Sequence, residues 1–244
     1  MTTRTAIVTG AASGIGRATT ELLLADGWNV CAFDRDPVTV PKGMNARFLA
    51  RIGDVSSTDD CEGTVAETII RFDRVDALLH FAALHDTNTW DTLDDDTFNR
   101  VLGVNVTGAF LMAKACANWM KDHGGGAVVL TGSGSINVSG LGGHGRGGPA
   151  YVTSKAAIIG LTRSLARSFG PLGIRVNAVS PGATDTAMTA DYSNDARAKV
   201  AERTLVGRMG TPEEIAKVAI FLASEGAAYM TGEIVNVNGG GSFG

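Results

Sequence analysis

Short apolar runs alternate with segments of helical periodicity along the whole chain of 244 residues. The runs are rich in β-branched residues, as buried strands are, and between them apolar residues return every three or four positions. Seven runs predict strands: Arg4–Val8, Trp28–Asp34, Ala46–Val55, Val75–Ala83, Gly126–Ser133, Ile174–Gly182 and Glu233–Gly240. Because strands that alternate with helices indicate βα units, the sequence predicts an α/β fold. We expect a doubly wound, mostly parallel seven-stranded sheet of the Rossmann type with helices on both faces.

Helices are expected between these strands, at residues 16–26, 57–72, 94–121, 150–169 and 211–224. Ser57, Thr58 or Asp59 suits the start of the second helix, because such side chains accept hydrogen bonds from first-turn N–H groups. Two segments, 134–149 and 183–196, have no helical period, and the first is dense in glycine. We expect both to be loops, and a loop as long as the first is usually functional or disordered.

Length and composition fit a single domain that spans residues 1–244. The net charge of -4 provides no basic surface for a nucleic acid. No apolar run approaches about 18 residues, and the first predicted strand starts at Arg4, so we expect neither a membrane span nor a leader peptide. A cytoplasmic location is therefore expected.

The three cysteines, Cys31, Cys61 and Cys116, are odd in number and far apart in the sequence. This arrangement predicts neither a disulfide framework nor a thiolate metal site, so we interpret all three as small core or surface residues. The four histidines have no metal-ligand spacing either. No metal is expected.

The stretch VTGAASGIGRA, Val8 to Ala18, links the first strand to the first helix through three glycines and contains no acid. A helix leaves the N–H groups of its first turn unpaired, and its dipole favours an anion at that end. Glycine lets the backbone approach such an anion closely. The stretch therefore suits a phosphate, although a tight strand-to-helix connection with no ligand would also need glycine.

Tyr151 and Lys155, in the stretch YVTSK, are four residues apart and so emerge on one face of a helix. A free tyrosine has a pKa of about 10, and a neighbouring ammonium can lower it by about two to three pH units. Tyr151 would then be a usable general acid or base. The pair alone is equally typical of an exposed helix surface.

Several short motifs occur together in a characteristic order: TGAASGIG, an acid at Asp34, GDV at Asp54, NVTG at Asn105, TGS at Ser133, YVTSK and SPGATDT. In this combination the chain resembles the compact single-domain branch of the short-chain dehydrogenase/reductase family. The resemblance extends from Thr5 to Gly240 and is highly specific as a set. It implies a Rossmann-type oxidoreductase that binds a nicotinamide dinucleotide.

The resemblance implies a cofactor site made of residues from five strand ends and from the stretch YVTSK. They are Gly10, Ser13, Gly14, Ile15, Gly16, Asp34, Asp54, Val55, Ala82, Tyr151, Lys155, Pro181, Gly182 and Thr186. The glycines would carry the pyrophosphate, and Asp34 would accept hydrogen bonds from the adenosine ribose, where a 2′-phosphate would meet like charge. Asp54 and Val55 would contact the adenine, and Thr186 the carboxamide. NAD is expected as the cofactor, although Arg35, next to Asp34, weakens that selectivity.

By the same resemblance, Asn105, Ser133, Tyr151 and Lys155 form the catalytic set. Tyr151 would protonate a carbonyl oxygen or deprotonate an alcohol, and Lys155 would lower its pKa and bind the nicotinamide ribose. Ser133 would hold the substrate oxygen. Asn105, at a break in the long helix, would position a water that relays protons through Lys155. The implied reaction interconverts a secondary alcohol and a ketone by hydride transfer, plausibly on a polyol, sugar derivative or hydroxy acid.

The chain departs from the family pattern in three places. The stretch HFAA, His80 to Ala83, stands where the family usually has NNAG, and we assign His80 a structural role. Ser133 lies farther before Tyr151 than is usual, which indicates an insertion after the serine, and Ser135 or Ser139 is the alternative catalytic serine. The inserted segment is the glycine-rich one, and it contains His144 and Arg146.

His85, His144 and Arg146 are either solvated loop residues or contacts to a polar or anionic group of the substrate, because substrates approach the carboxyl ends of the strands. Replacement of Arg146 by alanine would then raise KM far more than it changes thermal stability.

Three other functions are weighed against this one. A 3-oxoacyl thioester reductase would prefer NADP and a basic docking surface, which Asp34 and the negative net charge oppose. A sugar-nucleotide epimerase or dehydratase would need an added substrate domain. A non-catalytic dinucleotide sensor would not need the full catalytic set.

The resemblance also implies a homotetramer or homodimer joined through the long helices and the last strand. The small residues Ala109, Ala113 and Ala117 either permit close contact between subunits or pack against the sheet.

Overall fold

The computed structural model describes residues 3–39, 43–138, 147–190 and 192–243. Its seven strands form one parallel sheet in the order β3-β2-β1-β4-β5-β6-β7. The strands are β1 (Thr5–Thr9), β2 (Asn29–Asp34), β3 (Phe48–Ile52), β4 (Ala77–His80), β5 (Gly126–Thr131), β6 (Ile174–Pro181) and β7 (Ile234–Val237). The predicted α/β fold with a parallel seven-stranded sheet is confirmed.

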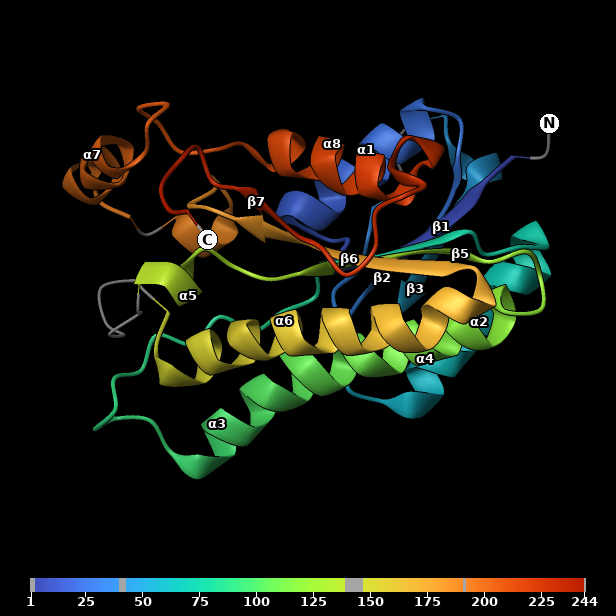
Figure 1. Ribbon diagram of the computed structural model, residues 1–244, viewed down its shortest axis with the longest axis horizontal. Coiled ribbons are helices and arrows are strands. Elements are labelled where there is room, and N and C mark those ends of the chain that lie inside the picture. The colour runs from blue at the N-terminus through green and yellow to red at the C-terminus, as the bar shows by residue number, and fades with distance from the viewer. Residues whose placement is uncertain (1–2, 40–42, 139–146, 191, 244) are drawn as a thin grey trace.

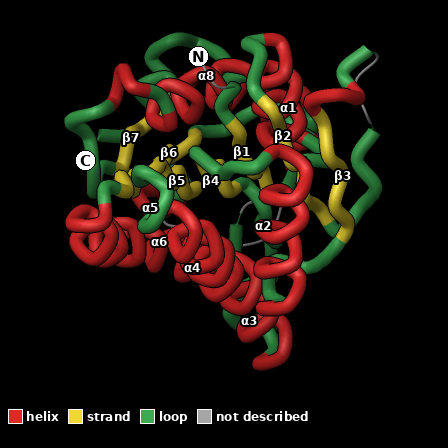
Figure 2. Tube along the Cα trace, turned by 90° about the vertical axis from the view of Figure 1, so that its right-hand side faces the viewer, coloured by secondary structure: helices red, strands yellow, loops and turns green. Residues whose placement is uncertain are grey.

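Helices cover both faces of the sheet, with α1 and α8 on one side and α2, α4 and α6 on the other (Figures 1 and 2). The α-helices are α1 (Gly14–Ala25), α2 (Thr58–Phe72), α3 (Asp95–Leu102), α4 (Gly108–Met120), α5 (Ser135–Val138), α6 (Pro149–Phe169), α7 (Asn194–Arg203) and α8 (Pro212–Ala223). Short 3-10 turns lie at Asn45–Arg47, Gly170–Leu172, Ala187–Thr189 and Glu225–Ala227. Ser57 is the residue that caps α2, since its Oγ accepts from the Asp60 N–H at 3.2 Å.

Two of these helices lie where the sequence predicts loops. The segment 134–149 contains α5, and α7 begins at Asn194, inside the segment 183–196. No residue of α7 is buried, so the helix has no apolar stripe for a periodicity argument to detect. The expectation of two wholly irregular segments is therefore wrong.

The core has two halves because successive strand residues point to opposite faces of the sheet. Ile7, Leu78 and Val128 pack under α2, α4 and α6, whereas their neighbours Val8 and Leu79 pack under α1 and α8. The three cysteines are free and buried, which places them in the core rather than on the surface.

The long helix predicted at 94–121 is α3 and α4 joined by a π-helical turn at Gly103–Thr107. Within the described part of the chain, Asp95–Met120 is the one helix long and apolar enough to cross a membrane, with a mean hydropathy of 1.2 in its most apolar window, of which 50% is buried. Its apolar positions include Ala109, Ala113 and Ala117, all buried in the core of the single chain. The core accounts for the apolarity, and these alanines pack inside the subunit rather than between subunits.

Candidate active site

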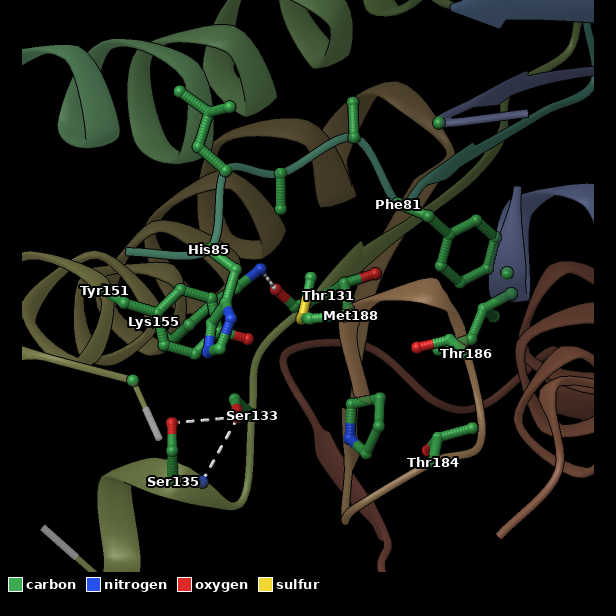
Figure 3. Close-up of a pocket in the computed structure, with 18 of the residues that line it drawn as sticks. Phe81, His85, Thr131, Ser133, Ser135, Tyr151, Lys155, Thr184, Thr186 and Met188 are labelled. Carbon is green, nitrogen blue, oxygen red and sulfur yellow. Dashed lines mark hydrogen bonds between the residues drawn. The ribbon is translucent and has the colours of Figure 1, made fainter. Parts of the chain in front are cut away.

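A cavity of about 1060 Å³ lies at the carboxyl ends of the strands, beside the point where the strand order reverses between β1 and β4. Such a switch point is where open α/β sheets bind ligands. All the predicted cofactor residues line this cavity, as do three of the four predicted catalytic residues: Gly10, Ser13, Gly14, Ile15, Gly16, Asp34, Asp54, Val55, Ala82, Ser133, Tyr151, Lys155, Pro181, Gly182 and Thr186. Figure 3 shows the part of the cavity around Tyr151. Asn105 does not line it.

The glycine turn between β1 and α1 forms one wall of the cavity. Gly10 has a φ of +66°, and a Cβ on Gly16 would lie 2.1 Å from the Gly10 carbonyl oxygen, so neither position accepts another residue without a shift. Ser13, the residue before α1, makes no side-chain bond to the first turn. The first-turn N–H groups of Gly14 to Gly16 are therefore left for an anion in the cavity.

Asp34 lies next to this turn, at the end of β2. Its Oδ2 accepts from the Ala12 N–H at 2.9 Å and its Oδ1 from the Asp36 N–H at 3.0 Å. These bonds fix the carboxylate against the glycine turn and leave further lone pairs for a ligand. The Arg35 guanidinium lies 3.8 Å from Asp36 and is mostly exposed.

The side chain of Ser133, at the end of β5, lies beside Tyr151, in the first turn of α6, and favours the ionised form of the Tyr151 hydroxyl by lowering its pKa. Ser135 lies behind Ser133 and donates to its Oγ from both the backbone N–H, at 3.1 Å, and the hydroxyl, at 2.9 Å (Figure 3). Between Ser133 and Ser135, Ser133 is thus the serine that acts on the Tyr151 hydroxyl. Ser139 lies outside the described residues.

Lys155 lies one turn along α6 and is 3% exposed. Its Nζ donates to the Thr131 carbonyl at 2.9 Å and lies 5.7 Å from the centre of the Tyr151 ring. Burial lowers the pKa of Lys155 to about 8. Burial also raises the pKa of Tyr151, and the hydrogen bond with Ser133 only partly opposes this. The expectation that Lys155 brings the Tyr151 pKa below 10 is wrong for this structure, because desolvation of the phenolate dominates.

Asn105, in the π-helical turn, is 1% exposed and uses its side-chain amide entirely within the protein. Its Nδ2 donates to the Leu84 carbonyl at 3.0 Å and to Ser154 Oγ at 2.9 Å, while its Oδ1 accepts from the Leu84 N–H at 2.7 Å. Asn105 therefore ties the loop after β4 to α6. The water that it is expected to position stays a prediction.

Ser154 is a buried residue beside the site that no motif in the sequence singles out. Besides accepting from Asn105, its hydroxyl donates to the Tyr151 carbonyl at 2.7 Å. The only signal in the sequence is its place inside YVTSK, directly before Lys155.

His80 replaces the usual asparagine at the end of β4 and is 2% exposed. Its Nδ1 lies 3.0 Å from Thr9 Oγ1, an atom that also accepts from the N–H groups of Phe81 and Ala82, each at 3.1 Å. Burial lowers the pKa of His80 to about 3, so the ring is neutral. These contacts agree with a structural role, since they hold the backbone at Ala82 against the cavity.

The loop after β6 closes the other side of the cavity. A Cβ on Gly182 would lie 2.8 Å from Asn238 Cα, and a Cβ on Gly14 would lie 3.3 Å from Thr186 Cγ2. Pro181, Gly182 and Thr186 thus lie where the resemblance places them, and the contact of Thr186 to a carboxamide stays a prediction.

Further residues line the cavity although no pattern in the sequence singles them out: Tyr192, Arg203, Asn238 and Ser242. Asn238 Nδ2 donates to the Ser242 carbonyl at 3.0 Å, so the glycine-rich end of the chain is packed there. His85 also lines the cavity, next to Tyr151. His144 and Arg146 lie outside the described residues.

These residues fit a nicotinamide dinucleotide. The cavity is at least as large as the about 300–1,000 Å³ usual for small-ligand sites, with unpaired N–H groups and a carboxylate at one end and a hydroxyl pair and an ammonium at the other. Within the described ranges, no group of three or more His, Cys, Asp or Glu could hold a metal ion.

Comparisons with curated proteins point to one family. A family model described as "Enoyl-(Acyl carrier protein) reductase" matches residues 10–242. Short-chain reductase protein NovJ of Streptomyces niveus is 36% identical over 249 residues, which cover 96% of this chain and 92% of that protein. The 3-oxoacyl-[acyl-carrier-protein] reductase FabG of Thermotoga maritima is 32% identical over 96% of each chain. The 3beta-hydroxysteroid dehydrogenase 2 of Eggerthella lenta is 32% identical over 98% of this chain and 95% of that protein.

Solved structures agree with this. A short-chain dehydrogenase/reductase from Brucella melitensis, titled a glucose/ribitol dehydrogenase, has a TM-score of 0.88 at 30% identity and covers both chains fully. A short-chain type dehydrogenase/reductase from Mycobacterium marinum has a TM-score of 0.91 at 29% identity and covers 100% of this chain and 97% of that one. With the glycine turn, Asp34 and the Ser133, Tyr151 and Lys155 cluster lining one cavity, this chain belongs to the compact, single-domain branch of the short-chain dehydrogenase/reductase family of nicotinamide-dinucleotide oxidoreductases.

Proposed function

We propose that this protein is an NAD-dependent oxidoreductase that interconverts a secondary alcohol and a ketone, on a small polar substrate such as a polyol, sugar derivative or hydroxy acid. The observation that carries this proposal is the placement of the Tyr151 and Ser133 side chains together inside the cavity that also contains the glycine turn. It supplies a proton donor and a second hydroxyl at one point, as reduction of a carbonyl requires.

Each residue of the cluster has a defined task in this proposal. Tyr151 donates its proton to the carbonyl oxygen or, in the oxidative direction, accepts the proton of the alcohol. Ser133 directs its hydroxyl to the same oxygen when the substrate enters. Lys155, held by the Thr131 carbonyl, keeps a positive charge near the Tyr151 ring below a pH of about 8. The bound nicotinamide supplies hydride transfer to or from the substrate carbon.

The preference for NAD over NADP is supported by Asp34. Its carboxylate lines the cavity and is held by the N–H groups of Ala12 and Asp36. A carboxylate held in this way can accept from the ribose hydroxyls, whereas a 2′-phosphate would lie against a fixed negative charge.

A 3-oxoacyl thioester reductase is the second candidate, because the matching family model and several relatives carry acyl-carrier-protein reductase names. Such an enzyme would dock an acidic carrier and would prefer NADP. The net charge of -4 and Asp34 oppose this function.

The proposal is tested by the absorbance of reduced nicotinamide, with NAD and NADP offered separately to a panel of alcohols and ketones that includes polyols, hydroxy acids and acetoacetyl coenzyme A. We expect turnover of a small alcohol with NAD and its loss in Tyr151→Phe. Preference for the thioester with NADPH would favour the second candidate. Binding of NAD without turnover of any compound would indicate a non-catalytic sensor, and full activity of Tyr151→Phe would refute the mechanism.

We further propose a homotetramer or homodimer, consistent with the family, and a cytoplasmic location, consistent with the composition. Light scattering on the purified protein measures the first, and fractionation of the source cells measures the second.

A further inference from the structure

His85 lies against the catalytic tyrosine. Its ring centre is 4.7 Å from that of Tyr151, and the two ring planes meet edge to face at 88°. Figure 3 shows the imidazole beside Tyr151 in the cavity, and Ser133 lines the same cavity. The imidazole therefore borders the space where the atoms next to a reacting carbon would lie.

The backbone on each side of His85 is fixed. Leu84 is held through both its N–H and its carbonyl by the Asn105 side chain, at 2.7 Å and 3.0 Å. The backbone carbonyl of Asp86 accepts a hydrogen bond from the Gly148 N–H at 2.8 Å, which joins the loop to the start of α6. A ring on a loop held at both neighbours is pre-organised, so it loses little entropy when it binds a ligand.

Among the described residues, neither ring nitrogen of His85 makes a hydrogen bond, and the partly buried side chain lines the cavity. A ligand that covers the ring would remove these nitrogens from water, which costs free energy unless the ligand forms hydrogen bonds to them. The nitrogens are thus suited to a substrate rather than to the fold.

The charge of the ring narrows the type of group that it would bind. Burial and the nearby Lys155 ammonium lower the pKa of His85, although the Asp86 carboxylate opposes them. A neutral imidazole has one donor and one acceptor nitrogen, which suits a hydroxyl, because a hydroxyl both donates and accepts. A carboxylate would instead require a cation at this position.

We propose that His85 determines specificity by hydrogen-bonding a hydroxyl group on the carbon next to the reacting carbon, so that the substrates are vicinal diols and the corresponding 2-hydroxyketones. This inference rests on the proposed function and makes it narrower: among polyols, sugar derivatives and hydroxy acids, it selects those with a neighbouring hydroxyl.

The experiment compares butane-2,3-diol with butan-2-ol, which lacks the second hydroxyl, and with 2-hydroxybutyrate, which replaces it by a carboxylate. The kcat/KM values are measured for the wild type, His85→Phe and His85→Gln. Phenylalanine keeps a ring against Tyr151 without the nitrogens, and glutamine restores a donor and an acceptor. We expect the wild type to prefer the diol to butan-2-ol by about ten-fold, the ratio to fall to about one in His85→Phe, and part of it to return in His85→Gln.

An unchanged ratio in His85→Phe, no diol preference in the wild type, or a preference for 2-hydroxybutyrate would overturn the inference. Calorimetric titration of the diol into the protein–NADH complex, which cannot oxidise it, measures binding apart from turnover. Diol binding that depends on His85 without any alcohol oxidation would support the inference and refute the proposed function. Equal oxidation of the diol and butan-2-ol would support the proposed function and refute the inference about His85.

Discussion

Ser135 donates two hydrogen bonds to a single atom, the Oγ of Ser133, from its backbone N–H at 3.1 Å and its hydroxyl at 2.9 Å. A hydroxyl oxygen has two lone pairs, so both are occupied. The remaining hydrogen-bonding capacity of Ser133 is its proton, and donation of this proton to the ionised oxygen of Tyr151 agrees with the lowering effect of Ser133 on the Tyr151 pKa. Ser135 is thus a positioning residue that makes Ser133 a donor.

Replacement of Ser135 by alanine removes one of these two bonds and loosens the orientation of the Ser133 hydroxyl. We expect kcat/KM for alcohol oxidation to fall about three-fold to ten-fold, the worth of one neutral hydrogen bond. Because a weaker bond from Ser133 stabilises the Tyr151 phenolate less, the pH profile of oxidation should also move to higher pH. Steady-state rates across the alkaline range measure both effects.

Ser135→Thr is the matched control, since it keeps the hydroxyl and should keep most of the activity. A Ser135→Ala variant with the wild-type rate and pH profile would show that Ser133 is held without its neighbour. Equal thermal unfolding midpoints exclude a general loss of structure as the cause.

The raised pKa of Tyr151 predicts opposite pH dependences for the two directions. Burial keeps its hydroxyl protonated near neutral pH, which suits reduction, because that direction consumes the proton. Oxidation needs the phenolate, so its kcat/KM should rise about ten-fold per pH unit until the Tyr151 pKa is reached. Initial rates in both directions, from about pH 6 to pH 10, test this, and an oxidation rate that is flat or falls toward alkaline pH contradicts it.

Asp34 predicts the effect of a charge change on cofactor choice. Asp34→Asn keeps an acceptor for the Ala12 N–H, which Asp34 now binds at 2.9 Å, but removes the negative charge. We expect the ratio of kcat/KM for NAD to that for NADP to fall by about ten-fold or more, because charged hydrogen bonds to the ribose are lost and the repulsion of a 2′-phosphate ends.

The neighbouring Arg35 provides the control for this change. Its exposed guanidinium is the cation nearest in sequence to Asp34, so Asp34→Asn combined with Arg35→Ala should lose the gain in NADP use. An unchanged cofactor ratio in Asp34→Asn would place the discrimination elsewhere in the cavity.

Most of the sheet and the glycine turn can be predicted from the sequence because their signals are local. Strand periodicity and a turn that needs a φ of +66° at Gly10 are visible within a few residues. Helix α7 is different, because it is capped by Ser193, which accepts from the Ala196 N–H at 3.2 Å, and has no buried side chain. Only the cap and the order of charges, with Asp195 early and Arg203 late, favour that helix.

The arrangement within the site depends on contacts between distant segments, so sequence patterns reveal the residues but not their partners. Asn105 meets Leu84 and Ser154, which are 21 and 49 residues away. Burial, which only the fold determines, also decides the direction of the Tyr151 pKa. For that reason the lowered Tyr151 pKa that a four-residue spacing from Lys155 predicts is wrong, because desolvation raises this pKa.

His80 predicts a loss of stability in acid. Its pKa is about 3 in the folded protein, whereas a free histidine has a pKa of 6.5, so between these pH values the unfolded chain binds a proton that the native ring does not. The free energy of unfolding should therefore decrease by about 1.4 kcal/mol for each unit by which the pH is lowered, on account of this one group. His80→Asn removes the titrating ring and leaves a polar side chain beside Thr9. A plot of the free energy of unfolding against pH should therefore be shallower for this variant by that amount.

Urea unfolding at several values from about pH 4 to pH 7 measures the two slopes. His123→Asn is a control for loss of an imidazole elsewhere, because His123 is exposed and stacked on Trp119. Parallel curves for the wild type and His80→Asn would mean that the ring accepts its proton inside the fold. A ring protonated at both nitrogens cannot accept a hydrogen bond from the Thr9 hydroxyl, so the contacts around Thr9 Oγ1 would have to rearrange, which hydrogen exchange at Phe81 and Ala82 would detect.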